Sequence, residues 1–469
     1  MRQGYSVRLD GDNIEQKRLE LREYFLQSYT LFESLFDIFV DDSVFYRQSE
    51  PTRHHMIFYF GHTSVFYINK LLKAGAITDG INSHFEHLFA VGVDEMSWDA
   101  DSGILKWPSV DEVRDYRARA KEIVLDFIAT HPLTLPVDQD SPFWAIWMGI
   151  EHERIHIETS SVLHRQMPLE FIKPQTAFSV CNDYGDTPKN EMVFIDGKTI
   201  TLGKGDSDSG LYGWDNEYGI YSDSVEGFRA SKYLVSNGEF LEFVRDGGYE
   251  NREFWDAEGQ KFLDIKEPKH PIFWIERDGR YLFRLFDREI ELPLNHPVEV
   301  NALEAEAFCR YKSQKDGVFY MLPSESQWRV MLEQSGMDSE IFDENRANIN
   351  LAHYASSVAV DRFSHGKLYD VVGNVWQWTS SQMDGFDWFK THYLYDDFST
   401  PTFDGKHNLI KGGSWISTGN EMVRESRYAF RRHFPQHAGF RYVIGTPESD
   451  EAKYKNMSDL WERWSEIYG

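Results

Sequence analysis

Two histidines one helical turn apart, His152 and His156, are the residues whose types and spacing point most directly to chemistry. Positions i and i+4 of a helix share one face, so both imidazoles could bind a single divalent metal ion. The alternative is a solvated helix in which two incidental histidines have no role. Trp144, Trp147 and Met148 instead favour a helix that is packed on several sides, and buried histidines need partners.

The helix that carries this pair is expected to begin at Ser141–Pro142, which is typical of an N-cap followed by a first-turn proline. Pro168 ends the run. Three carboxylates lie beside the histidines in the sequence, on Glu151, Glu153 and Glu158. We expect them to orient the imidazole rings as hydrogen-bond acceptors.

A third ligand is expected from another helix, because two histidines do not complete a catalytic metal site. His62 lies between Gly61 and Thr63, small residues that would let a second helix approach. Three imidazoles could hold zinc, copper or iron, and the spacing does not choose among these metals. Each histidine could equally be an ordinary core or surface residue. The other candidate ligands are His54, His55, His84 and His87.

Four long amphipathic segments are predicted to position these histidines, at residues 13–36, 52–75, 109–130 and 141–168. Ser109 with Glu112 matches a capping box, and Gly75 is a suitable C-cap. Four such helices predict a bundle, an architecture that holds metals between facing helices.

The remaining chain has a different pattern. Residues 171–190 are rich in proline, asparagine and aspartate and are predicted to be a linker after a helical domain at 1–170. Residues 191–450 predict short strands and turns, with two short helices at 237–248 and 301–314. Residues 451–469 are predicted to be a C-terminal helix or tail.

The composition excludes several classes of protein. A chain of 469 residues with a net charge of −27 is poorly suited to binding nucleic acid, because phosphate would be repelled. Its two cysteines, Cys181 and Cys309, exclude a disulfide framework and a thiolate zinc cluster. The first residues form no apolar signal segment, and no run is long enough to span a membrane, so a cytoplasmic protein is expected.

Six motifs between residues 191 and 445 resemble the formylglycine-generating-enzyme (sulfatase-modifying-factor) family, which has an elaborated C-type-lectin-like fold. They are VSNGEFLEFVRDGGY, HPVEVNALEAEAFCRY, LPSESQW, DVVGNVWQW, IKGGSW and AGFRYV. The helical part resembles a DinB-like four-helix bundle. A helical bundle followed by this second domain resembles the iron(II)-dependent sulfoxide synthases of thiol-histidine biosynthesis. The resemblance implies an α+β fold class.

The ovothiol branch of these synthases is the most similar, on FYFGHTSVFYINKL, VGVDEMSWD, MGIEHERIHIETSSVL and THYLYDDFSTPTFDGKHNLIKGGSW. This resemblance implies a non-heme iron(II) enzyme that uses O2 to join L-cysteine to L-histidine, giving 5-histidylcysteine sulfoxide. A separate methyltransferase would act later in the pathway, because no glycine-rich nucleotide loop follows residue 450.

Three departures from related branches bear on the substrate. The segment ESRYAFRRHFPQH lacks the cysteine pair with which formylglycine-generating enzymes work. Ile155 stands where the ergothioneine branch usually has glutamine, and VGVDEMSWD is acidic where that branch tends to use an arginine pair. The alternatives are an ergothioneine-type synthase, acting on N-trimethylhistidine (hercynine) with cysteine or γ-glutamylcysteine, and a non-catalytic, metal-binding lectin-like module.

The resemblance also implies roles for individual residues. His62, His152 and His156 would bind Fe(2+), and Tyr395, preferred over Tyr393, would face the iron and supply a proton. The remaining candidates would bind the charged groups of zwitterionic substrates: Arg427, Arg431 and Arg432 the carboxylates, and Asp396 or Asp397 an ammonium or imidazole. The alternative for these charged residues is a surface cluster of salt bridges.

Overall fold

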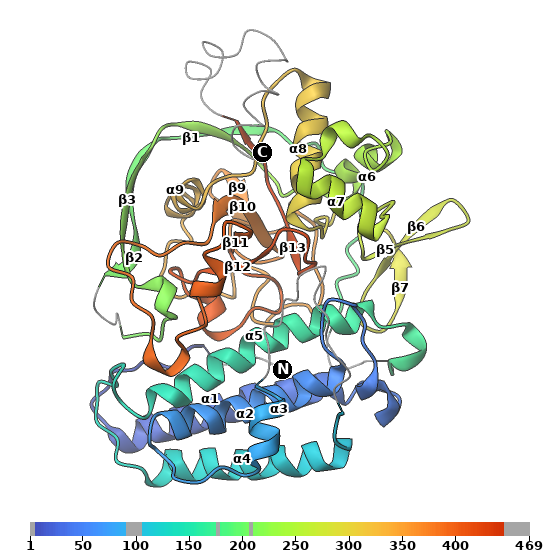
Figure 1. Ribbon diagram of the computed structural model, residues 1–469. Coiled ribbons are helices and arrows are strands. Elements are labelled where there is room, and N and C mark those ends of the chain that lie inside the picture. Colours follow the sequence, from blue (N-terminus) through green and yellow to red (C-terminus); the bar gives the residue numbers. More distant parts are fainter. Residues whose placement is uncertain (1–4, 91–105, 175–178, 206–209, 445–469) are drawn as a thin grey trace.

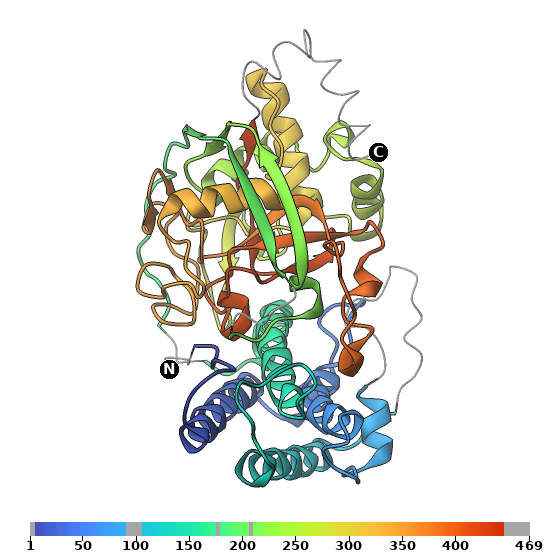
Figure 2. The same cartoon turned by 90° about the vertical axis from the view of Figure 1, so that its left-hand side faces the viewer.

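The computed structural model describes residues 5–90, 106–174, 179–205 and 210–444. A layer of helices lies beneath a larger mixed part of helices and short strands (Figures 1 and 2). The helices of the first layer are α1 Ile14–Phe36, α2 Met56–Lys73, α3 Ser83–Leu88, α4 Val110–Thr130 and α5 Trp144–Gln166. The four long predicted helices are therefore present, and their likeness to DinB proteins stays a prediction.

Local capping fixes where these helices begin. The side chain of Ser109 accepts a hydrogen bond from the Glu112 backbone in the predicted capping box of α4. The N-cap predicted at Ser141 is wrong by two residues, because the N-cap of α5 is Phe143. The Trp144 backbone N–H donates to the Ser141 carbonyl at 2.9 Å, so the residues around Pro142 form a separate turn before the helix.

Helix α5 lies between the other helices and the mixed part (Figure 1). Every residue of α5 except Ile155 and Gln166 is buried. A Cβ atom on Gly149 would lie 2.2 Å from the ring of Tyr67 on α2. The glycine therefore permits the close approach of α2 to α5 that brings their histidines together.

Among its described residues, the mixed part that follows the predicted linker contains four α-helices, α6 Asn237–Arg245, α7 Ala257–Lys266, α8 Ala302–Asp316 and α9 Glu325–Ser335. The prediction found α6 and α8 but missed α7 and α9. The missed α9 carries a capping box formed by Ser324 and Gln327, a signal that is present in the motif LPSESQW. The division into domains at 170 and 191 stays a prediction.

Within the described part of the chain, short strands form five small sheets. Their orders are β1-β4-β14, β12-β11-β10-β13, β2-β3, β5-β6-β7 and β8-β9. The strands are β1 Met192–Ile195, β2 Lys198–Gly205, β3 Gly219–Val225, β4 Phe228–Ser231, β5 Trp274–Arg277, β6 Arg280–Arg284, β7 Glu289–Glu291, β8 Ser364–His365, β9 Leu368–Tyr369, β10 Trp376–Gln382, β11 His407–Lys411, β12 Tyr428–Arg431, β13 Ala438–Gly439 and β14 Val443–Ile444.

The four-stranded sheet contacts α5 directly. Trp376 on β10 donates its indole N–H to Glu158 of α5 at 2.6 Å. Helix α5 is therefore bonded directly to the sheet. Residues of β12, and of the loop that comes before β12, can share a site with α5.

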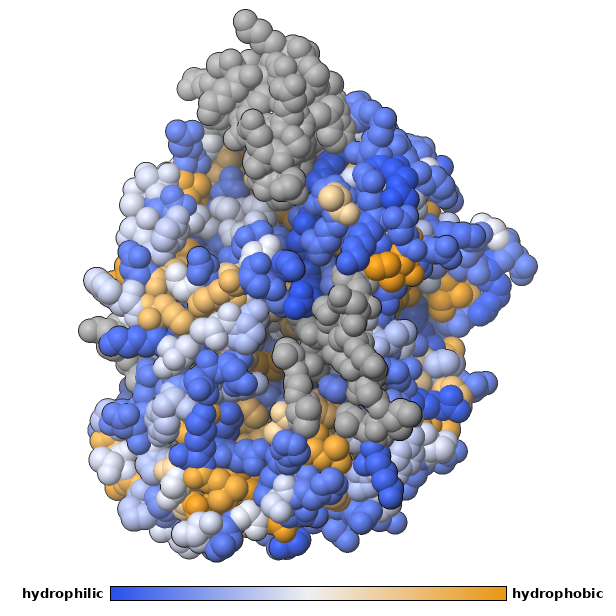
Figure 3. All heavy atoms as spheres, viewed as in Figure 1, coloured by the Kyte–Doolittle hydropathy of each residue, from blue (hydrophilic) through white to orange (hydrophobic). Residues whose placement is uncertain are grey.

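The surface and the thiols agree with the composition. The face in Figure 3 is mostly hydrophilic, with separated apolar spots. None of the described helices combines the length and apolar character needed to cross a bilayer. Cys181 and Cys309 are buried free thiols.

A buried ion pair also fastens α5 to the mixed part. Arg165 of α5 lies 2.6 Å from Glu299, and His437 lies 3.1 Å from the same carboxylate. Burial raises the pKa of Glu299, but the charge of Arg165 and the hydrogen bond from His437 outweigh it and hold this pKa at about 2. The carboxylate is therefore charged at neutral pH.

Replacing Glu299 with glutamine is expected to lower the free energy of unfolding by about 3–5 kcal/mol, because it leaves the Arg165 charge buried without its partner. Chemical denaturation at pH 7 measures this change. The pKa of Glu299 in the folded protein lies below its unfolded value of about 4.3. The difference in unfolding free energy between wild type and variant should therefore be constant above about pH 5 and should become smaller as the pH falls toward 2.

Asp264→Asn is the matched control, because Asp264 pairs with Arg252 on the surface, where the two side chains are 61% and 49% exposed. A change within about 0.5 kcal/mol is expected there. Equal effects of the Glu299 and Asp264 variants would contradict the role given to the buried pair.

Candidate metal centre

His62 from α2 and His152 and His156 from α5 meet where the two helices approach each other. One ring nitrogen of each histidine lies within 4.8 Å of the others. The Nε2 atoms of His62 and His152 are 3.2 Å apart. The structure thus brings together the three residues that the sequence singled out, and their arrangement suits three ligands of one ion.

The protonation of these rings also suits metal binding. The Nδ1 atom of His62 lies 2.5 Å from the carbonyl oxygen of Phe89, to which Nδ1–H donates, so its Nε2 lone pair faces the other histidines. Burial, followed by the neighbouring His156, His62 and Lys70, lowers the pKa of His152 well below its usual value. His152 is therefore neutral at pH 7, the form in which imidazole binds a metal.

Aromatic rings hold two of the imidazoles in place. Phe66 stacks on His152 with centroids 3.6 Å apart and an interplanar angle of 5°. Phe58 stacks on His62 at 5.0 Å and 21°. Both phenylalanines belong to α2, four residues on either side of His62, so one face of this helix supplies a ligand and the packing of two ligands.

The expectation that three glutamates orient these rings is wrong. Successive residues of a helix are rotated by about 100°, so the carboxylates leave other faces of α5 than the histidines. Their hydrogen-bond donors are Tyr24 for Glu151, Tyr67 for Glu153, and Trp376, Ser414 and Ser417 for Glu158. These glutamates fasten α5 to its neighbours.

The three histidines open into a cavity of about 220 Å³ between α5 and the four-stranded sheet. Residues from the two helices form one wall, and residues from β12 and the 395–402 turn form the other. The lining includes Phe58, His62, His152, Ile155, His156, Thr159, Asn216, Met383, Tyr395, Asp397, Phe398, Ser399, Thr402, His407, Arg427, Tyr428, Phe430 and Arg431.

The structure distinguishes the two candidate tyrosines. Tyr395 lines the cavity, and its ring centroid lies 6.2 Å from that of His152. Tyr393, at the start of the same single turn, η5 Tyr393–Tyr395, is 45% exposed and is absent from the cavity lining. Of the two, Tyr395 has the position that a proton donor at this site requires.

A lysine that the sequence analysis missed holds this turn against α2. The ammonium of Lys70 donates to the Leu394 carbonyl at 2.6 Å and lies 3.8 Å from the centre of the Tyr395 ring. Burial, then the charge of Lys73, lowers the pKa of Lys70 to about 8. Lys70 follows His62 and Phe66 at four-residue intervals, and this spacing was the available signal.

The charged substrate-binding candidates divide into two groups. Arg427, Arg431 and Asp397 line the cavity. The Arg427 guanidinium is buried and bonded to both Glu325 carboxylate oxygens at 3.1 Å, so it is positioned rigidly. Arg431 lies 3.8 Å from Asp404, and its expected contact with a substrate carboxylate stays a prediction.

Arg432 and Asp396 lie away from the cavity. Arg432 binds Asp256 at 2.6 Å and Glu258 at 2.9 Å, within a buried ionic cluster. Asp396 binds Lys73 at 2.8 Å on the surface. Their expected substrate contacts are therefore corrected. Strand β12 ends at Arg431 and a turn begins at Arg432, so the two arginines face different surroundings.

The model of the sulfatase-modifying factor enzyme 1-like domain matches residues 178–446, which is more than half of the chain. The chain belongs to this family. The match covers the mixed part of the structure and not the helices that carry the three histidines.

Curated relatives extend the similarity into those helices. Ergothioneine biosynthesis protein 1 of Schizosaccharomyces pombe is 23% identical over 438 residues, which cover 84% of this chain and 51% of that protein. Hercynine oxygenase of Mycolicibacterium smegmatis is 26% identical over 331 residues, covering 65% of this chain and 71% of that protein. Formylglycine-generating enzyme of Mus musculus is 28% identical over 263 residues, which cover 48% of this chain and 66% of that protein.

The chain thus spans about half the length of the fission-yeast relative that it matches. Two of the departures noted in the sequence can be placed. Ile155 lines the cavity beside His156, whereas VGVDEMSWD, at residues 91–99, lies outside the described residues.

Proposed function

We propose that this chain is an iron(II)- and O2-dependent sulfoxide synthase that couples the sulfur of a cysteine-type thiol to the imidazole of hercynine. The observation that carries the proposal is the cavity that three clustered histidines from α2 and α5 line together with Tyr395. The fission-yeast and mycobacterial relatives are named for ergothioneine biosynthesis and for hercynine. These names support the ergothioneine-type acceptor over the ovothiol-type acceptor predicted from the sequence.

The donor set fits iron(II). Three imidazoles provide half of an octahedral shell and carry no charge, so the metal would keep its full positive charge. When bound there, iron(II) would supply thiolate binding and the activation of dioxygen. The reaction balances as thiol plus imidazole plus O2 giving sulfoxide plus water: a C–S and an S–O bond form, S–H and C–H bonds break, and O2 accepts four electrons.

The protein's own residues would orient the substrates and deliver a proton. Arg431 on β12 is suited to a substrate carboxylate, and Asp397 to an ammonium group. The Tyr395 hydroxyl would act as general acid, steering the thiol toward coupling and away from oxidation to a sulfinate. Holding both substrates on fixed elements of the cavity wall would supply the orientation that coupling needs.

Product analysis after anaerobic loading with iron(II) tests the acceptor. We expect exposure to O2 with cysteine or γ-glutamylcysteine plus hercynine to give the coupled sulfoxide by mass spectrometry. Sulfinate as the sole product, or no O2 uptake, would contradict the proposal, and the second result would favour a non-catalytic module.

Histidine as the acceptor is the second candidate, and one observation favours it. Ile155 is an apolar lining residue where ergothioneine-type synthases usually place a glutamine for the trimethylated substrate. Coupled product with histidine in preference to hercynine would establish this ovothiol-type activity.

The contacts of Lys70 predict that it positions Tyr395. Lys70→Met removes the ammonium that holds the 393–395 turn, and we expect the ratio of coupled product to sulfinate to fall about tenfold, because small misplacements of reacting groups are costly. Lys70→Arg should restore most of this ratio.

Lys73→Met is the control, since its bond to Asp396 joins two exposed side chains. We expect its product ratio to stay within about twofold of wild type. Equal product ratios in wild type and Lys70→Met would show that Lys70 does not position the tyrosine.

A further inference from the structure

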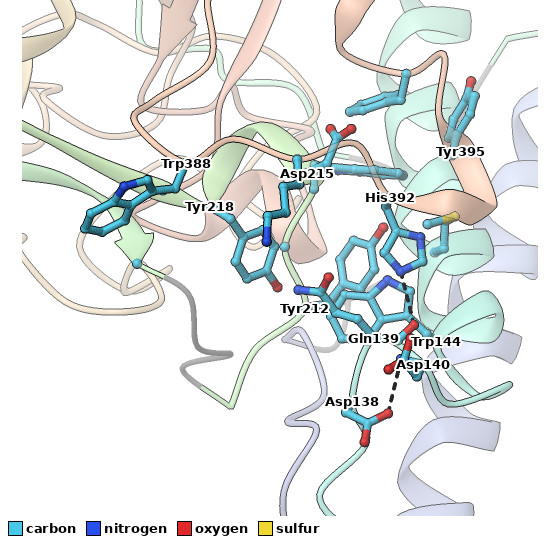
Figure 4. Close-up of a pocket in the computed structure, with 17 residues that line it drawn as sticks. Asp138, Gln139, Asp140, Trp144, Tyr212, Asp215, Tyr218, Trp388, His392 and Tyr395 are labelled. Atoms are coloured by element: carbon cyan, nitrogen blue, oxygen red, sulfur yellow. Dashed lines mark hydrogen bonds between the residues drawn. The ribbon is translucent and has the colours of Figure 1, made fainter.

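A second cavity of about 540 Å³ lies next to the metal cavity. The two share Tyr395 and Phe398 in their linings. Figure 4 shows Asp138 and Asp140 at one end of the second cavity and Trp388 at another, with Asp215, Tyr218 and His392 between them. The catalytic proposal assigns this space no role.

Three carboxylates make the second cavity acidic. Asp138 and Asp140 are exposed, whereas Asp215 is 6% exposed. Ser399 donates to one oxygen of Asp215, and the backbone N–H groups of His392 and Asn216 also donate to this carboxylate. Burial raises the pKa of Asp215 to about 6, so this carboxylate is ionised at neutral pH.

The basic groups of the lining do not cancel this charge. Lys390 is exposed and its flexible side chain can reach solvent. His392 accepts from the Leu394 backbone N–H on Nδ1 and donates from Nε2 to the Gln139 carbonyl at 3.1 Å, as the dashed line in Figure 4 marks. Both ring nitrogens of His392 are therefore engaged by backbone groups.

Aromatic side chains form much of the wall. The Tyr212 ring packs on Trp144 at 4.9 Å and stands perpendicular to Trp214 at 5.3 Å. Tyr212 is fully buried, and its hydroxyl has no hydrogen-bond partner among the described residues. The lining therefore combines a buried carboxylate with electron-rich rings.

The rim of this cavity holds a strained, exposed tryptophan. Trp388 is 72% exposed and has a φ of 71°. A bulky residue in the left-handed region costs about 1–3 kcal/mol, and such strain is concentrated at functional sites. Neither burial nor a turn-favouring residue type accounts for a tryptophan in this position.

We propose that this second cavity binds an organic cation, an ammonium compound of about amino-acid size. Its charge would pair with Asp215, and its N-alkyl groups would pack against Trp388 and the buried aromatic wall. Rings that face a cation attract it through their quadrupole, and a nearby carboxylate reinforces this attraction. The site lies outside the metal cavity and does not depend on the proposed reaction.

Titration of metal-free protein with choline, followed by calorimetry and tryptophan fluorescence, tests this site. We expect choline to bind at least about tenfold more tightly than its uncharged isostere 3,3-dimethylbutan-1-ol. Asp215→Asn should weaken choline binding about tenfold, and Trp388→Ala about fivefold. Asp264→Asn, a surface variant, should leave it unchanged.

Trp388→Ala keeps the test decisive if Asp215→Asn perturbs folding, because Trp388 is largely exposed. Equal binding of choline and the alcohol, absence of choline binding, or choline binding unchanged by Trp388→Ala would overturn the proposal. The assay contains neither iron nor O2, so its failure is distinct from failure of the proposed catalytic function.

Discussion

His152→Ala is expected to lower the affinity of the protein for iron(II) by more than about 100-fold and to abolish coupling. Changes to residues that only support a metal ligand already cost up to about 100-fold, and this change removes a ligand. His152 also stacks on Phe66 and lies 3.2 Å from His62, so no other side chain can take its place without repacking. Anaerobic equilibrium dialysis followed by metal analysis measures the affinity.

His55→Ala is the matched control, because His55 caps the N-terminus of α2, the helix of His62, and does not line the metal cavity. Its iron affinity should equal that of the wild type. Full iron occupancy in His152→Ala at the wild-type concentration would contradict the three-histidine assignment. His62→Ala and His156→Ala should behave as His152→Ala does.

Tyr395→Phe is expected to slow coupling by about 100-fold while iron binding stays unchanged, since positioned general acids contribute about 10²–10⁴-fold. The variant keeps the aromatic ring, whose centroid lies 5.1 Å from that of Phe66 and 3.8 Å from Nζ of Lys70. Only the hydroxyl is therefore lost. Cysteine sulfinate should become the main product. Stopped assays with mass spectrometry quantify both products.

Tyr393→Phe makes the same chemical change two residues away, on an exposed side chain. It should leave both the rate and the product ratio at wild-type values. Loss of coupling in Tyr393→Phe with full coupling in Tyr395→Phe would reverse the assignment of the two tyrosines.

Local signals explain what the sequence predicted well. The i, i+4 pair and helical periodicity placed His152 and His156 on one face, and the capping box at Ser109 fixed the start of α4. His62 was singled out by its small neighbours, which reflect close packing between helices. Periodicity and capping act over a few residues, so they can be recognised without the rest of the chain.

Contacts between distant segments could not be predicted in the same way. Lys70 acquires its position from Leu394, 324 residues later in the chain. Arg427 is held by Glu325, and Arg432 is occupied by an ionic cluster that includes Asp256. Short strands with irregular loops carry weak local patterns, so the sequence did not show which arginine faces the cavity.

The measurement that tests the central claim most directly is product formation under isotopically labelled dioxygen by the iron(II)-loaded protein with a cysteine-type thiol and hercynine. The three-histidine cavity with Tyr395 predicts a coupled sulfoxide that carries one labelled oxygen atom, and loss of this product in His152→Ala. Iron-loaded protein that consumes labelled O2 but forms only cysteine sulfinate would contradict the account, as would the same labelled product from His152→Ala.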